Sequence, residues 1–139
     1  MSSEMEFRLE VIVVPVSDVD RAKDFYTEKA GFKLEVDSQQ GPNVRVVQAT
    51  PPGSAVSIAF GTGIVPMEPG SLKGLQLVVK DVRAARELLA ERGVDVSEVQ
   101  VFEAGERRAA REDDDLDTAG YVFFNDPDGN AWAVQQMAK

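Results

Sequence analysis

The side chains in this sequence that could perform chemistry are carboxylates, amides and phenols, because its 139 residues include no Cys and no His. The absence of Cys excludes disulfides, zinc thiolate sites and cysteine nucleophiles. The absence of His excludes imidazole ligands, Ser-His-Asp triads and a histidine general base. A metal ion would therefore have to bind carboxylates, carbonyls or amides, which favours Mg²⁺ or Ca²⁺. Glu10, Tyr121 and Asp126 remain as acid–base candidates, although their spacing does not bring two carboxylates together.

Two acidic segments could bind a cation, and both have a simpler interpretation. Asp126–Gly129 fits a tight turn, because Asp forms local backbone bonds, Pro fixes φ and Gly accepts a positive φ. Asp113–Asp115 with Asp117 lacks the alternating ligands and central Gly of a calcium loop, so we predict a solvated, mobile loop that could act as a lid. The nearby arginines are Arg107, Arg108 and Arg111. We expect them to pair with the acidic run, and the alternative is a lid arginine that meets an anionic ligand.

Composition and charge narrow the class of protein. Hydrophobic residues make up 43% and charged residues 28%, as in globular proteins, and the length fits one domain over residues 1–139. The net charge of −9 argues against binding to nucleic acid or to an anionic membrane surface. The start has no secretory signal pattern, and the longest apolar run, Val11–Val16, is too short to cross a bilayer. We therefore expect a cytoplasmic protein without nucleic-acid or membrane partners.

Hydrophobic periodicity predicts the elements that position these side chains. In the first half we expect a strand, a helix and three strands: Leu9–Val16, Arg21–Lys29, Phe32–Val36, Val44–Ala49 and Ala55–Phe60. A Gly- and Pro-rich linker follows, and then the pattern restarts with a helix that Asp81 caps and Gly93 stops. The extended segments of the second half are Leu72–Val79, Val94–Phe102, Tyr121–Asn125 and Ala131–Gln136.

The two halves are copies of one β-α-β-β-β pattern. Their residues match at an offset of 63 around the helices and of 76 around the last turns. The offsets differ by 13 residues, so the second half contains an insertion, which falls in the polar stretch Glu103–Thr118. Neither half has enough strands to close a core alone, so we expect the halves to pair. We divide the domain into module one (residues 8–61), a linker (62–71) and module two (72–139).

Several motifs of these modules occur together in a known family. They are Val16–Asp18, Phe25-Tyr26, Gly31-Phe32, Leu77–Asp81 and Phe124–Asn130. Their combination on paired modules resembles the vicinal oxygen chelate superfamily, which includes glyoxalase I, extradiol dioxygenases and the fosfomycin and bleomycin resistance proteins. The resemblance covers nearly the whole chain. It implies an α+β fold in which two tandem βαβββ modules form curled mixed sheets around an open cup, and it implies a homodimer.

In the enzymes of that superfamily, the cup holds one divalent metal bound by His, Glu or Gln from the first and last strands of each module. The matching positions in this sequence are Val11, Ser57, Gly74 and Ala133. None of these side chains binds a cation well, so we expect no metal and no cofactor. Gln76 and Gln135 lie two residues away on the same strand faces, but two amides alone make a poor metal site.

Strand alternation assigns the aromatic residues near the cup to opposite faces. If Ala133 faces the cup, Trp132 faces the helices and packs in the core. One of two alternating pairs must look into the cup: Tyr121 with Phe123, or Val122 with Phe124. The first pair would form an aromatic wall, and the sequence leaves both alternatives open.

We favour a metal-free small-molecule-binding protein that resembles the bleomycin-resistance branch and holds an apolar or aromatic compound in the cup. The acidic surface would suit a cationic ligand. The expected lining residues are Val11, Val13, Ser57, Gly74, Gln76, Tyr121, Phe123, Ala133 and Gln135. One alternative is a lyase, isomerase or dioxygenase of the same superfamily with an atypical or absent metal site, so the sequence leaves open whether the chain is an enzyme. The other is a dimeric interaction module without a ligand.

Overall fold

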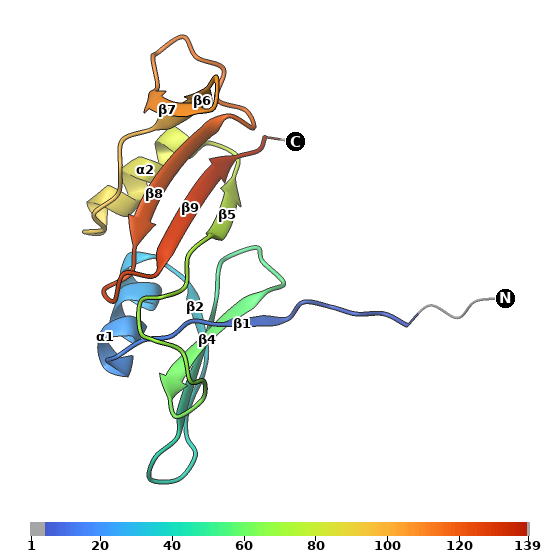
Figure 1. The fold of residues 1–139 in the computed structure, drawn as a ribbon, viewed down its shortest axis with the longest axis vertical. Helices are drawn as coiled ribbons and strands as arrows, with labels where there is room; N and C mark the ends of the chain where they lie inside the picture. Colours follow the sequence, from blue (N-terminus) through green and yellow to red (C-terminus); the bar gives the residue numbers. More distant parts are fainter. Residues whose placement is uncertain (1–4, 139) are drawn as a thin grey trace, which may run out of the picture.

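Two β-sheets, each covered by a helix on one side, make up the part of the chain that the computed structural model describes, residues 5–138 (Figure 1). Sheet A has the strand order β1-β4-β3-β2, and sheet B has the order β5-β9-β8-β6-β7. The strands are β1 (Val11–Val13), β2 (Lys33–Gln39), β3 (Arg45–Thr50), β4 (Ser57–Thr62), β5 (Leu75–Val79), β6 (Gln100–Glu103), β7 (Glu106–Ala109), β8 (Gly120–Asn125) and β9 (Ala131–Gln136). The helical segments are α1 (Val19–Asp24), the π-helical η1 (Phe25–Lys29) and α2 (Val82–Glu91). Both modules thus have the predicted β-α-β-β-β pattern, and sheet B has one extra strand.

Both α-helices begin at an aspartate whose side chain satisfies a free backbone N–H. Asp18 accepts a hydrogen bond from the N–H of Arg21, and Asp81 accepts one from Ala84, each at 3.1 Å. The helix predicted over Arg21–Lys29 is confirmed, although its second half, η1, is π-helical. It ends before Gly31, whose φ of +81° favours glycine. No helix within residues 5–138 is long and apolar enough to cross a membrane.

Four predicted segments differ from the structure. The strand expected at Leu72–Val79 begins only at Leu75, after Gly74 with its positive φ of 88°. The strand expected at Leu9–Val16 is limited to β1, and residues 5–9 extend away from the sheets (Figure 1). The segment Val94–Phe102 becomes a strand only in β6. Asp113–Asp115 and Asp117, predicted as a loop, lie outside any helix or strand, but the start of the insertion forms the second strand of the β6–β7 hairpin at the edge of sheet B. Ala104 and Gly105 connect its strands with positive φ angles of 55° and 81°, the pattern of a two-residue hairpin turn.

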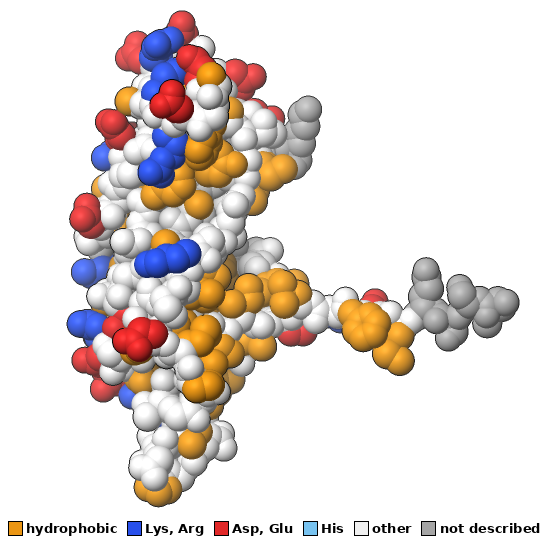
Figure 2. All heavy atoms as spheres, in the orientation of Figure 1, with side chains coloured by type: hydrophobic (Ala, Val, Ile, Leu, Met, Phe, Trp, Pro, Cys, Tyr) orange, Lys and Arg blue, Asp and Glu red, His pale blue; other side chains and the backbone are white. Residues whose placement is uncertain are grey.

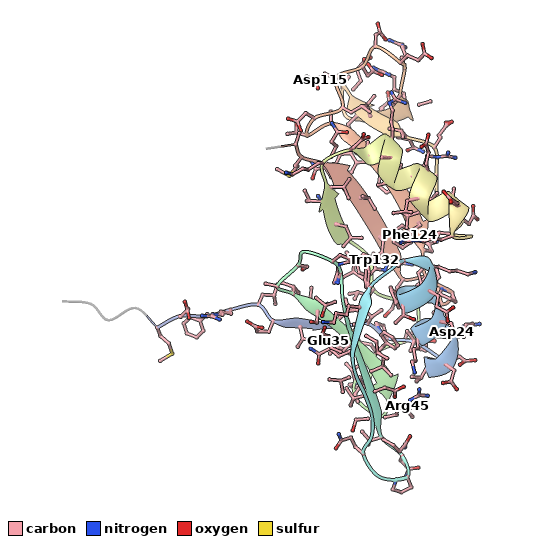
Figure 3. All side chains as sticks on the ribbon, turned by 180° about the vertical axis from the view of Figure 1, so that it is seen from behind. Asp24, Glu35, Arg45, Asp115, Phe124 and Trp132 are labelled. Atoms are coloured by element: carbon pink, nitrogen blue, oxygen red, sulfur yellow. The ribbon has the colours of Figure 1, made fainter. Side chains whose placement is uncertain are left out.

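The hydrophobic core lies on the helix side of both sheets and is continuous between the modules. Alternate strand residues are buried there, among them Val47, Phe60, Val122 and Val134. Aromatic rings join the modules, since the ring centroid of Tyr26 lies 5.8 Å from that of Trp132, and Phe25 lies 6.1 Å from Phe124. Figure 3 shows Phe124 and Trp132 where sheet B meets the helix of module one. Trp132 therefore faces the helices, as predicted.

The turn Asp126–Asn130 ties module two to module one. The carboxylate of Asp128 accepts hydrogen bonds from the backbone N–H and the hydroxyl of Ser17. The side chain of Asn130 donates to the carbonyl of Pro15 at 2.8 Å. The prediction of a turn is confirmed by the backbone hydrogen bond that closes it. The sequence did not show that the polar side chains of this turn hold the modules together.

Candidate ligand-binding surface

The faces of the two sheets that point away from the helices contain the predicted site residues. On sheet A these are Val11, Val13 and Ser57. On sheet B they are Gln76, Tyr121, Phe123, Ala133 and Gln135, with Gly74 directly before β5. Figure 2 shows hydrophobic side chains gathered on this side of the molecule, over both sheets. We call these two surfaces the open faces of sheets A and B.

The open face of sheet A is built from small residues. Val11 pairs in register with Ser57, and Val13 pairs with Ala59. The hydroxyl of Ser57 shares a 2.6 Å hydrogen bond with that of Thr50, and its residue is only 7% exposed. This hydroxyl therefore already has a partner within the sheet.

The open face of sheet B carries three aromatic residues, Phe102, Tyr121 and Phe123, which we call the aromatic row. The rings of Tyr121 and Phe123 are parallel, with centroids 5.9 Å apart and 3° between their planes. Phe102 meets Tyr121 edge to face at 5.2 Å. The sequence left open which alternating pair of β8 lies on this face. It is Tyr121 with Phe123, because Val122 and Phe124 are buried on the helix side. Phe102 was missed, since only the position of β6 beside β8 brings it to this face.

A pair of glutamines lies beside the aromatic row. The amide of Gln76 donates a hydrogen bond to the side-chain oxygen of Gln135, whose own amide donates to the carbonyl of Thr118 at 2.8 Å. Ala133 pairs in register with Gln76 on one side and with Phe123 on the other. The small side chain of Ala133 therefore lies between the polar Gln76 and the aromatic Phe123.

The three arginines of the insertion have different environments. Arg108 bonds to Glu103 and Asp114, and the hydrogen bonds from the Arg108 side chain and the Arg111 backbone hold the pKa of Asp114 well below its ordinary value. The guanidinium carbon of Arg107 lies instead 4.5 Å from the ring centroid of Phe123. Within residues 5–138, neither Arg107 nor Arg111 forms a side-chain ion pair. The expectation that these arginines pair with the acidic run is therefore right for Arg108 and wrong for Arg107, while Arg111 contacts Asp114 through its backbone N–H at 2.6 Å.

The residues at the superfamily's metal-ligand positions do not fit a divalent metal. Val11, Gly74 and Ala133 offer no donor atom from their side chains, and the hydroxyl of Ser57 is bonded to Thr50. Within residues 5–138, no three carboxylates come close enough to form a metal site elsewhere. We therefore assign no metal-dependent step to this surface.

The predicted acid–base candidates do not converge. Asp126 is buried, and its carboxylate accepts hydrogen bonds from the hydroxyl of Tyr26 and the amide of Asn130, both at 2.7 Å. Burial and this carboxylate raise the pKa of Tyr26. Glu10 is exposed before β1, and Tyr121 lies on the open face of sheet B. Asp126 is therefore a structural residue on the helix side.

A cavity of about 160 Å³ lies where the two sheets meet. Its lining includes Ile12, Gly74, Gln76 and Trp132. Of the nine predicted site residues, only Gly74 and Gln76 border it. Within one chain the predicted residues thus form two groups, one on each sheet, and this cavity does not unite them.

Comparison with known proteins agrees with this architecture. The profile of the Glyoxalase/Bleomycin resistance protein/Dioxygenase superfamily matches residues 8–134. The chain belongs to this superfamily. Among solved structures of similar fold is TnmS3 from Streptomyces sp. CB03234, described as an antibiotic binding protein, with 34% identity and a TM-score of 0.74 over 97% of this chain and 99% of that one. A glyoxalase/bleomycin resistance protein from the same organism is 36% identical, with a TM-score of 0.69 over 93% of this chain and all of its own.

A further superfamily member from Sphaerobacter thermophilus is 29% identical, with a TM-score of 0.73 over 96% of this chain and 99% of its own. These similarities confirm the superfamily and its fold of two similar modules, as the sequence motifs implied. The superfamily contains both binding proteins and enzymes, so the site itself has to distinguish between them.

Proposed function

We propose that this superfamily member binds an apolar or aromatic small molecule on its open sheet faces without a metal. The observation that supports this most directly is the aromatic row, in which two partly buried parallel rings lie next to the Gln76–Gln135 pair. Aromatic side chains that are left uncovered on a sheet favour stacking with a planar ligand, and nearby amides orient it. The 34% identity to an antibiotic binding protein supports the same class of function.

We also propose that a second copy of the chain completes the cup. The arm before β1 exposes apolar side chains at alternate positions, with Met5, Phe7 and Leu9 at 75%, 86% and 66% exposure. Side chains at alternate positions of an extended segment share one side. An exposed apolar stripe of this kind is typical of a surface that a partner covers. In such a homodimer, sheet A of one copy would face sheet B of the other, bringing the two groups of site residues together.

Ligand screening tests the proposed binding. Wild-type protein would be screened by native mass spectrometry against a library of planar aromatic compounds that includes antibiotics. We expect complexes that are lost in Phe123→Ala and retained in Leu34→Ala, a matched removal of an exposed apolar side chain on β2. Compounds that bind equally to both variants would contradict a site on sheet B.

Metal loading tests the proposal that binding occurs without a metal. The protein would be incubated with Ni²⁺, Zn²⁺, Mn²⁺, Fe²⁺ and Mg²⁺, desalted and analysed for metal content. We expect no stoichiometric retention, because the ligand positions lack donor atoms. Retention of about one ion per chain would favour the enzyme alternative instead.

A further inference from the structure

We infer that the site selects planar aromatic compounds that carry an anionic group, with Arg107 as the residue that recognises the charge. This inference rests on the proposed binding function and adds the ligand class. It departs from the cationic ligand that the acidic composition would suit, because the local charge of the open face differs from the charge of the whole chain.

The first step is the position of Arg107. Its partner in the β6–β7 register is Phe102, so both side chains lie on the open face of sheet B. There the guanidinium stacks over Phe123. Stacking on a ring occupies one face of the guanidinium and leaves the N–H groups at its rim available to an acceptor.

The second step is the distribution of charge on this hairpin. Alternation places Glu103, Glu106 and Arg108 on the opposite face from Arg107. Arg108 is there neutralised by Glu103 and Asp114. The two neighbouring arginines thus have separate roles. Arg108 holds the hairpin, and Arg107 presents its charge to the aromatic row.

The third step concerns the rest of the face. The strand residues that point to the open side of sheet B are Gln76, Val78, Gln100, Phe102, Arg107, Ala109, Tyr121, Phe123, Asn125, Ala131, Ala133 and Gln135. Arg107 is the one basic side chain in this set, and the set contains no carboxylate. Among these strand side chains, Arg107 therefore supplies the one charge, and it is positive on a chain whose net charge is −9. A ring stacked on the aromatic row would place a carboxylate, sulfonate or phenolate within reach of the guanidinium, and charge-assisted hydrogen bonds of this kind are strong.

Two fluorescent probes that share the same ring system and differ in charge distinguish charge recognition from stacking. They are 8-anilinonaphthalene-1-sulfonate and the uncharged N-phenyl-1-naphthylamine, which lacks the sulfonate. We expect wild-type protein to bind the sulfonate more tightly, and Arg107→Gln to weaken its binding about tenfold while changing that of the neutral probe by less than about twofold. Arg111→Gln is the matched control, because it removes the same charge from the same insertion without a side-chain ion pair, and it should change neither affinity.

Phe123→Ala should weaken both probes, which distinguishes the two proposals. If both probes depend on Phe123 but Arg107→Gln leaves their affinity ratio unchanged, the charge inference is overturned and binding on this face stands. If Phe123→Ala affects neither probe, both proposals fail for this surface. If wild-type protein binds neither probe, the inference is overturned, and the library screen alone decides the proposed function.

Discussion

The hydroxyl of Tyr26 in module one donates a 2.7 Å hydrogen bond to Oδ2 of Asp126 in module two. Both residues are buried, and the same hydroxyl accepts a hydrogen bond from the indole N–H of Trp132 at 3.0 Å. The backbone N–H groups of Asp128 and Asn130 donate to the other oxygen of Asp126. A buried carboxylate is stable only when it is bonded in this way. The modules are therefore joined by a polar network as well as by aromatic packing.

Replacing Tyr26 with Phe should lower the free energy of unfolding by about 2 kcal/mol, because Asp126 and Trp132 each lose a buried partner. Urea unfolding followed by the fluorescence of Trp132 measures this. Tyr121→Phe makes the same chemical change on the open face of sheet B, and it should cost less than about 0.5 kcal/mol. Equal effects in the two variants would show that the network adds nothing to stability.

The apolar stripe of the arm should determine the oligomeric state. We expect the double substitution Phe7→Ser and Leu9→Ser to raise the dimer dissociation constant by more than about tenfold, because both side chains would be covered by the partner. Light scattering coupled to size-exclusion chromatography measures the mass. The control is Glu6→Ser with Arg8→Ser. It removes the polar side chains that alternate with the apolar stripe and bond to one another, and it should leave the dimer intact. A wild-type protein that stays monomeric at all concentrations would contradict the proposed dimer.

The pair Asp37–Arg45 should make stability depend on pH in the acidic range. Hydrogen bonds from Arg45 and Lys23 hold the pKa of Asp37 well below its ordinary value of 3.8. A carboxylate whose folded-state pKa is depressed contributes stability at neutral pH and loses it as the pH falls below the unfolded value and through the folded one. Asp37→Asn should therefore lower the urea midpoint more at pH 7 than at pH 3.

Asp24→Asn is the control for this measurement, because Asp24 is an exposed carboxylate of α1 for which the structure shows no ion pair within residues 5–138 (Figure 3). Its effect on the urea midpoint should be small at both pH values. Since the Asp37 contact is partly exposed to solvent, 0.5 M NaCl should reduce the difference at pH 7. A difference that grows as the pH falls would contradict the assignment.

Phe102 should contribute to binding without contributing much to folding. It is 49% exposed and meets Tyr121 edge to face. Phe102→Ala should weaken binding of the neutral naphthylamine probe about fivefold, which corresponds to an aromatic contact of about 1 kcal/mol. Fluorescence titration and urea unfolding of the same variant separate the two effects. A large loss of stability with unchanged affinity would place Phe102 in the core instead.

Local patterns in the sequence predicted the elements that depend on local chemistry. The caps Asp18 and Asp81 and the strand Ala131–Gln136 agree with the structure, because side-chain capping and strand alternation are properties of neighbouring residues. Burial of Trp132 followed from the same alternation. Eight of the nine predicted site residues lie at the expected strand positions, Gly74 lies directly before β5, and their joint role in binding stays a prediction.

Features that depend on contacts across the chain were not predictable in this way. The hairpin strand Glu106–Ala109 has no apolar alternation, so its sequence resembles a solvated loop until β6 pairs with it. That pairing also places Arg107 over Phe123 and Phe102 beside Tyr121. The strand predicted to start at Leu9 begins only at Val11, because the last backbone hydrogen bond between this segment and β4 on its N-terminal side is the one from Ser57 to Glu10 among the described residues.

The hairpin that bears Arg107 joins the molecule through one strand only, since β7 pairs with β6 alone. Packing between the modules depends on other residues, in the helices, the inner strands and the turn at Asp126. If Arg107 selects ligands by charge as proposed, that selectivity depends on a hairpin residue that the packing between the modules does not use. A set of variants altered only at exposed hairpin positions would keep one common scaffold while differing in the compounds they retain, and such a set could be selected for new ligands without rebuilding the interior.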